Sequence, residues 1–350
     1  MLTQRNRRSS IVTIGAALLA IMLVIAGCGG GNGGGNAAAD AGKEADAGKE
    51  LKKVQVVLDW TPNTNHTGLY VARDKGFFKE QGLDVEIIQP GQTGADQMVA
   101  SGGVQFGVSY QESITMARIA GVPIVSIAAV IQHNTSGFAS LKAKGIDSPA
   151  KFEGQRYGGW GAPLEEAVIT SLMQEQGADV SKVELMSIGD SDFFAAVKRD
   201  IDFAWIYYAW TGIEAELRGE EINMVYLTDY SDKLDYYTPV LATNEKMIAE
   251  QPDTVKAFVA GAAKGYTYAI EHAEEAADIL IAAEPDLNEE LVHASQKWLA
   301  SRYQDDAPRW GEQKLSVWEN YAEWMYDKGL LEGRLEAEKA FTNVFLPENE

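Results

Sequence analysis

Short apolar runs typical of buried strands alternate with helix-like segments along this 350-residue chain, and the alternation starts twice. This order constrains the fold more than any other feature, because strands joined by crossover helices form a largely parallel sheet. The first series has predicted strands at 54–58, 85–88, 106–109 and 122–131, and predicted helices at 66–75, 92–100 and 112–119.

The pattern begins again after the glycine-rich residues 145–161. This second series has predicted helices at 163–176, 192–199 and 210–218, and predicted strands at 183–187, 203–206 and 222–227. Five predicted helices then follow, at 252–272, 273–283, 288–302, 311–328 and 333–343.

Two α/β series in one chain predict an α/β fold of two lobes. The helical C-terminal segment is expected to cover the first lobe, so that the chain crosses between the lobes near residues 140 and 240. Lobe 1 would then comprise residues 51–140 and 240–350, and lobe 2 residues 141–239. Ligands of such sheets bind beyond the carboxyl ends of the strands, so we expect a small-molecule site in the cleft between the lobes.

The first 50 residues differ in composition from the rest. Three arginines precede an uncharged, mostly apolar run at 11–26, which is short for a membrane span and typical of a signal peptide. It ends in Ile25-Ala26-Gly27-Cys28, which resembles a bacterial lipobox, and Cys28 is the single cysteine of the chain. The alternatives are a plain membrane anchor, or a cleaved signal with an unrelated cysteine.

We therefore expect residues 1–27 to be a lipoprotein signal peptide and Cys28 to carry a lipid anchor. The polar, glycine-rich residues 28–50 would form a flexible tether that holds the folded part at the extracytoplasmic face of the cell membrane. The formal charge of −21 becomes −24 without the three arginines of the signal, which argues against a nucleic-acid partner.

The stretch that follows the first predicted strand is unusually rich in hydrogen-bonding groups. Asp59, Trp60, Asn63 and His66 stand there, at a carboxyl strand end that should face the cleft. Trp60 offers a flat surface for stacking, and the asparagine carries both donor and acceptor groups. A plain helix entry, with Trp60 in the core and His66 in a cap, is the alternative.

Similar polar residues follow the next two strands. Gln92 and Thr93 open one predicted helix, and Ser109 and Tyr110 precede another, so that free backbone N–H groups at both places would point into the cleft. These residues also serve as ordinary helix caps. The glycine pattern of nucleotide-binding loops does not occur at these turns.

The second lobe offers glycines, acids and aromatic rings at its strand ends. Gly159 and Trp160 end a strand, and Pro163 and Glu166 begin a helix in which an acid also suits the helix dipole. Trp205, Tyr208 and Glu214 come from the segment DFAWIYYAWTGIE. Aromatic rings there would clamp a planar ligand opposite Trp60, although about half of those in the segment are expected in the core.

Catalytic patterns are few in this sequence. The four histidines lack H-x-x-x-H spacing, no G-x-S-x-G elbow occurs, and the single cysteine lies in the predicted anchor. We therefore expect no catalytic residues, no metal site and no cofactor, and we interpret the chain as a binding protein rather than an enzyme.

Three segments carry a resemblance to a known family: LDWTPNTNHTGLYVARDKGFFKEQGLDVEI, GIDSPAKFEGQRYGGWGAPLEEA and DFAWIYYAWTGIEAELRG. The chain resembles the thiamine-pyrimidine-precursor binding proteins of bacterial ABC importers over residues 54–345. The resemblance implies a type 2 periplasmic-binding-protein fold, with two lobes and a two-crossing hinge. It also implies a formylated or free aminomethyl-aminopyrimidine ligand for thiamine salvage, and ABC permease and ATPase subunits as partners.

The same family includes the fungal pyrimidine synthase, which uses a histidine and a cysteine-rich motif. This chain departs from that pattern, because no cysteine remains after Cys28. Other relatives bind riboflavin, sulfonates or nitrate. The predicted cleft segments have Arg73 and Arg156 only at their margins, which favours a neutral or cationic heteroaromatic ligand and leaves riboflavin as the main alternative.

Overall fold

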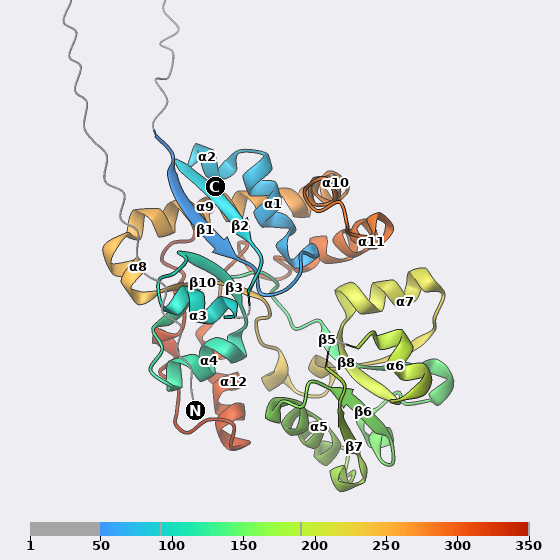
Figure 1. Cartoon of the computed structure of the whole chain (residues 1–350). Coiled ribbons are helices and arrows are strands. Elements are labelled where there is room, and N and C mark those ends of the chain that lie inside the picture. Colours follow the sequence, from blue (N-terminus) through green and yellow to red (C-terminus); the bar gives the residue numbers. More distant parts are fainter. Residues whose placement is uncertain (1–49, 92, 190, 349–350) are drawn as a thin grey trace, which may run out of the picture. The chain divides into compact units, whose positions relative to one another are not determined.

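The computed structural model describes residues 50–91, 93–189 and 191–348. The predicted signal peptide, Cys28 and Gln92 lie outside the described residues. The described residues belong to one compact unit, and no helix among them is long and apolar enough to cross a membrane. Two five-stranded sheets organise this unit (Figure 1).

The first sheet has the strand order β2-β1-β3-β10-β4. Its strands are β1 (Lys52–Val57), β2 (Leu83–Ile88), β3 (Phe106–Ser109), β4 (Ile124–Ala129) and β10 (Val240–Asn244). Helices α1 (Thr67–Asp74), α2 (Phe77–Glu80), α3 (Ala95–Ala100) and α4 (Gln111–Ile119) connect the first four strands. β1 pairs in parallel with β2 and β3, whereas β10 is antiparallel to β3 and β4.

The second sheet has the order β7-β6-β8-β5-β9. Its strands are β5 (Ser136–Leu141), β6 (Arg156–Gly159), β7 (Glu184–Ser187), β8 (Phe203–Tyr207) and β9 (Ile222–Tyr226). Its helices are α5 (Pro163–Glu175), α6 (Phe193–Arg199) and α7 (Ile213–Arg218). Here β5 is the antiparallel strand, against both β8 and β9.

The expectation of largely parallel sheets is therefore confirmed for four strands of each sheet, and one strand in each is an exception. The exceptions are β5 and β10, each the first strand after the chain has passed from one sheet to the other. Each runs opposite to its neighbours. The chain passes between the sheets at residues 130–135 and 227–239, between β4 and β5 and between β9 and β10. β5 pairs within the second sheet, so the first passage precedes residue 140.

The helical C-terminal segment comprises α8 (Glu245–Glu250), α9 (Pro252–Glu271), α10 (Ala273–Ala283), α11 (Glu289–Leu299) and α12 (Leu315–Asp327). The helix expected at 333–343 is wrong, since only a 3₁₀ turn at Ala337–Lys339 forms there. The backbone after this turn bonds to the edge of the first sheet: Ser126 N donates to Ala340 O, and Thr342 N donates to Ser126 O. Pairing with the edge of β4 satisfies groups that a helix would have bonded internally.

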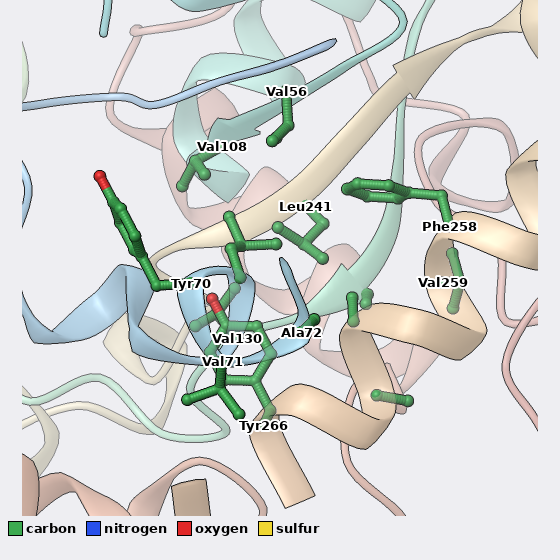
Figure 2. Close-up of a cluster of buried hydrophobic side chains, with 14 of the residues drawn as sticks. Val56, Tyr70, Val71, Ala72, Val108, Val130, Leu241, Phe258, Val259 and Tyr266 are labelled. Carbon is green, nitrogen blue, oxygen red and sulfur yellow. The ribbon is translucent and has the colours of Figure 1, made fainter. Parts of the chain in front are cut away.

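Helix α9 packs against the first sheet and α1, as Figure 2 shows for Val56, Tyr70, Val108, Phe258 and Tyr266. The approach of α1 and α9 depends on two glycines. A Cβ atom on Gly265 would lie 2.0 Å from Gly68 O, and one on Gly68 would lie 2.2 Å from the Tyr266 ring. The close contact holds the residues before α1 in a fixed position.

Helix α12 packs on both sheets. The C-terminal segment was expected to cover only the first lobe, so its contact with the second sheet is a difference from that expectation. Trp318 belongs to the core of the first sheet and stacks on Phe341. Tyr321 and Trp324 belong to the core of the second sheet, where Trp324 Nε1 donates to Ser171 Oγ at 3.3 Å.

Candidate ligand-binding site

A pocket of about 470 Å³ lies where strand ends of both sheets meet. The first sheet contributes residues that follow β1 and β3, and the second contributes Trp160 after β6 and residues of β8. Its lining consists of Asp59, Trp60, Thr61, Asn63, Thr64, Asn65, Tyr110, Glu112, Trp160, Trp205, Ile206, Tyr207, Ala209, Trp210, Thr211 and Thr238. Its size suits a small molecule, and it lies at the carboxyl strand ends where such folds bind ligands.

The segment after β1 has a fixed conformation. Asn63 Oδ1 accepts the Asn65 N–H at 2.9 Å and so caps the short 3₁₀ turn at Thr64–His66. The C-terminal helices hold the same segment: Tyr303 Oη donates to Thr64 O at 2.6 Å, and Tyr266 Oη donates to Asn65 O at 2.7 Å. Asn63 therefore both caps the turn and lines the pocket.

His66 lies behind the pocket wall instead of lining it. Its side chain is fully buried, and its Nδ1 accepts the Asn63 N–H at 3.2 Å. This bond leaves Nε2 as the donor to Asp59 Oδ1 at 2.6 Å. The expected ligand contact of His66 thus becomes a positioning role, because the ring is occupied on both nitrogens.

Asp59 is a buried carboxylate with a partner for each oxygen. Tyr110 Oη donates to Oδ2 at 2.5 Å, and His66 donates to Oδ1. Burial raises the pKa of Asp59, but the interaction with His66 and the hydrogen bond from Tyr110 reverse this and hold the pKa below its usual value. Burial and the Asp59 charge raise the pKa of Tyr110, which keeps its phenol protonated as a donor. The pocket wall therefore carries a fixed negative charge.

Two large aromatic side chains are exposed at the pocket. Trp60 is 51% exposed and Trp160 is 54% exposed, whereas Trp205 is 8% exposed. Exposed aromatic surface at a pocket indicates contact with an apolar or planar group. Glu165 fixes the backbone around Trp160, since it accepts the Trp160 N–H at 3.0 Å and the Tyr157 hydroxyl at 2.5 Å.

The other expected site residues are distributed over neighbouring pockets. Thr93 and Ser109 line a space of about 260 Å³ that shares Asp59 and Tyr110 with the main pocket. Gly159 and Glu214 line one of about 370 Å³ that shares Trp60, Trp160 and Trp205. Pro163 and Glu166 line a third, of about 290 Å³, which shares no residue with the main pocket.

Three expected contacts are absent from the lining of the main pocket, each for a local reason. Tyr208 begins the π-helical turn Tyr208–Gly212, and it packs on Trp298 and bonds to Glu216. Glu166 is exposed on α5, because Glu165 is the residue that turns inward to cap the strand end. Glu214 pairs with Arg218 on the same helix.

Sequence reasoning missed Glu112 and Thr238, which line the pocket. Glu112 is in the first turn of α4, directly after the expected Tyr110, so its place beyond a strand end was the available signal. Burial raises the pKa of Glu112 to about 8. Thr238 lies in the second passage between the sheets, where no sequence pattern marks a site.

Comparisons with known proteins agree with this architecture. The chain matches the NMT1/THI5 like family over residues 63–276. It is 31% identical to the formylaminopyrimidine-binding protein of Halalkalibacterium halodurans, over 84% of this chain and 91% of the relative. It is 24% identical to the 4-amino-5-hydroxymethyl-2-methylpyrimidine phosphate synthase of Legionella pneumophila, over 85% and 93% of the two chains.

Two further similarities concern ligand class and fold. The riboflavin-binding protein RibY of Chloroflexus aurantiacus is 23% identical over 96% of this chain and 97% of the relative. The periplasmic aliphatic sulphonate binding protein SsuA of Escherichia coli superposes with a TM-score of 0.65 at 11% identity, over 85% of this chain and 94% of that one. The expected periplasmic-binding-protein fold is confirmed, and the chain belongs to the NMT1/THI5 like family.

Proposed function

We propose that this chain is the solute-binding protein of an ABC importer and captures a pyrimidine precursor of thiamine. The proposed ligand is N-formyl-4-amino-5-aminomethyl-2-methylpyrimidine or a close analogue. The similarity to the formylaminopyrimidine-binding protein supports this ligand class. A lipid on Cys28 would hold the protein at the extracytoplasmic face of the cell membrane, next to the permease that receives the ligand.

The observation that carries the proposal is the pairing of exposed aromatic surface with a fixed carboxylate in one pocket. Trp60 and Trp160 offer faces to a planar ring, and Asp59 provides negative charge that favours a neutral or cationic ligand over an anion. The arginines that a sulfonate or nitrate would require are absent from the lining of this pocket.

Ligand capture would follow from the position of the pocket between the two sheets. Trp60 lines the pocket from the first half, and Trp160 and Trp205 line it from the second, so a bound ligand would join the two halves. It favours the closed arrangement only by the difference between its affinities for the closed and open forms. The permease would recognise that closed form.

Riboflavin is the second candidate, and one observation favours it. The main pocket shares Trp60, Trp160 and Trp205 with the neighbouring space of about 370 Å³, so the two together offer room for a ring system larger than a pyrimidine. The similarity to RibY extends over nearly the whole chain. An enzymatic role is less well supported, because the thiol cluster of the fungal synthase has no counterpart in a chain with one cysteine.

Thermal unfolding of residues 48–350 against a ligand panel tests the proposal. The panel comprises formylaminopyrimidine, aminomethyl-aminopyrimidine, hydroxymethylpyrimidine, thiamine, riboflavin, taurine and nitrate. A ligand at 100 times its dissociation constant stabilises the folded state by about 2.7 kcal/mol, which raises the melting temperature by roughly 4 °C. We expect this rise with the aminopyrimidines, whereas a rise with riboflavin alone would overturn the proposed ligand.

A further inference from the structure

Three polar atoms at the pocket are buried without a hydrogen-bond partner among the described residues. They are Glu112 Oε2, Trp205 Nε1 and Thr238 Oγ1. Buried polar atoms in folded proteins nearly always have partners, since an unpaired group loses its hydrogen bonds to water without replacement. These three residues line one pocket, so a ligand bound there would supply the missing partners.

Glu112 holds a fixed place in this group. It lies in the first turn of α4, and the neighbouring Gln111 anchors that turn: its Oε1 accepts the Tyr237 N–H at 2.8 Å, and its Nε2 donates to Val317 O at 3.1 Å. Glu112 is half-buried as a residue, while its Oε2 atom is inaccessible to solvent. Glu112 is therefore held in the pocket lining by a rigid helix start.

The groups around this carboxyl disfavour its charged form. Asp96 of α3 adds negative charge, and the rings of Tyr207, Tyr236 and Tyr321 face it from β8, from the second passage and from α12. None of these groups is a cation, and burial is the main reason that the pKa of Glu112 rises to about 8. At neutral pH the side chain is therefore mostly a neutral acid, although it stands at a helix N-terminus.

A neutral carboxyl group presents one donor and one acceptor side by side. The matching ligand edge has an acceptor next to a donor, as in a heteroaromatic ring with an exocyclic amino group beside a ring nitrogen. The negative charge of Asp59 in the same pocket disfavours an anionic ligand in its place.

We propose that Glu112 determines specificity by pairing, as a neutral acid, with a ring nitrogen and its adjacent exocyclic amino group. One oxygen accepts from the amino group, and the O–H donates to the ring nitrogen. The inference rests on the proposed function, because it specifies how that site reads an aminopyrimidine. Trp205 Nε1 and Thr238 Oγ1 provide the further donor groups for polar substituents of the ring.

Calorimetric titration of Glu112→Gln and Glu112→Leu tests this pairing. The probes are N-formyl-4-amino-5-aminomethyl-2-methylpyrimidine and its analogue without the 4-amino group. Glu166→Gln is the matched control, because Glu166 is exposed and lies outside the pocket. Melting temperatures of all variants report whether each one folds.

The leucine variant should bind the amino ligand at least about tenfold more weakly, because it removes a pair of hydrogen bonds. It should weaken the deamino analogue less, because that analogue has only the bond at its ring nitrogen to lose. Glutamine keeps one donor and one acceptor, so that variant should stay within about threefold of wild type at pH 7. Wild-type affinity should fall by about tenfold per pH unit above pH 8, where the neutral acid is lost, whereas the glutamine variant should show no such fall.

Equal weakening of both ligands by the leucine variant, or unchanged affinity for the amino ligand, would overturn the assignment while the proposed function stands. If the leucine variant does not fold, the pH profiles decide: a glutamine variant that keeps the wild-type profile overturns the pairing. A wild-type protein that binds neither probe overturns the proposed function and this inference together.

Discussion

His66 Nε2 lies 2.6 Å from Asp59 Oδ1, and the other nitrogen of the same ring accepts the backbone N–H of Asn63. The histidine thus joins the carboxylate of the pocket wall to the turn that begins α1. The buried imidazole of His66 therefore contributes to the site by positioning the Asp59 carboxylate.

Replacement of His66 by alanine should weaken both ligand binding and stability. The buried Asp59 carboxylate would lose one of its two donors, and an unpaired buried group costs about 1–3 kcal/mol. Denaturant unfolding and calorimetric titration measure the two effects. His272→Gln is the control, since His272 is exposed; a His66 variant with the stability and affinity of that control would refute the positioning role.

Replacement of Trp60 or Trp160 by alanine should reduce affinity without loss of stability. Both side chains are more than half exposed, so little buried apolar area is removed from the fold. Stacking of an aromatic base contributes about 1–3 kcal/mol, which corresponds to a loss of roughly five- to 150-fold in affinity. Tyr326→Ala, at an exposed aromatic outside the pocket lining, should leave affinity unchanged. An unchanged dissociation constant for Trp60→Ala would remove that residue from the site.

Stability should depend on pH through His133, which lies in the first passage between the sheets. Its Nδ1 is 2.6 Å from Asp235 in the second passage, and its Nε2 is 3.2 Å from Asp306. The hydrogen bond to Asp235, with a further contribution from Asp306, raises the pKa of His133 to about 9. Because the folded-state pKa lies above the unfolded one, the stabilisation is complete below about pH 6.5 and is lost as pH rises towards 9.

His133→Gln should therefore differ most from wild type at pH 6 and least above pH 9. Chemical unfolding at several pH values in this range measures the difference. A stability difference that stays constant across this pH range would contradict a raised pKa of His133 in the folded state.

Gly265→Ala should destabilise the contact between α1 and α9. The added Cβ would lie 2.0 Å from Gly68 O, a backbone atom that cannot move without shifting α1. Overpacking of this kind typically costs about 1–3 kcal/mol, and here a backbone shift would also displace the segment that carries Asp59. Gly333→Ala is the control, because a Cβ there has no neighbour within 4 Å; equal unfolding midpoints for the two variants would contradict the packing argument.

Much of the first sheet could be predicted from residues alone. β1 and β3 have apolar periodicity with clear turns, and their carboxyl ends placed Asp59, Trp60 and Tyr110 at the pocket as expected. β5 (SGFASL) and β10 (VLATN) were missed, because small and polar residues become strands there only through pairing with distant partners.

The site itself was predicted in part for similar reasons. Trp160 and Trp205 reach the main pocket, whereas the π-helical turn after β8 takes Tyr208 away from it. The place of Glu112 beyond a strand end could be read from the sequence, but its unpaired side-chain oxygen is a property of the folded surroundings. A local sequence pattern records strand ends, but it does not record which polar atoms remain unpaired after folding.

Calorimetric titration of wild-type residues 48–350 with N-formyl-4-amino-5-aminomethyl-2-methylpyrimidine tests the central claim most directly, with riboflavin as the competing ligand. We expect saturable binding of one pyrimidine per chain, with a dissociation constant of about 1 μM or lower, equivalent to at least about 8 kcal/mol. Saturable binding of riboflavin together with no heat from the pyrimidine would contradict the account.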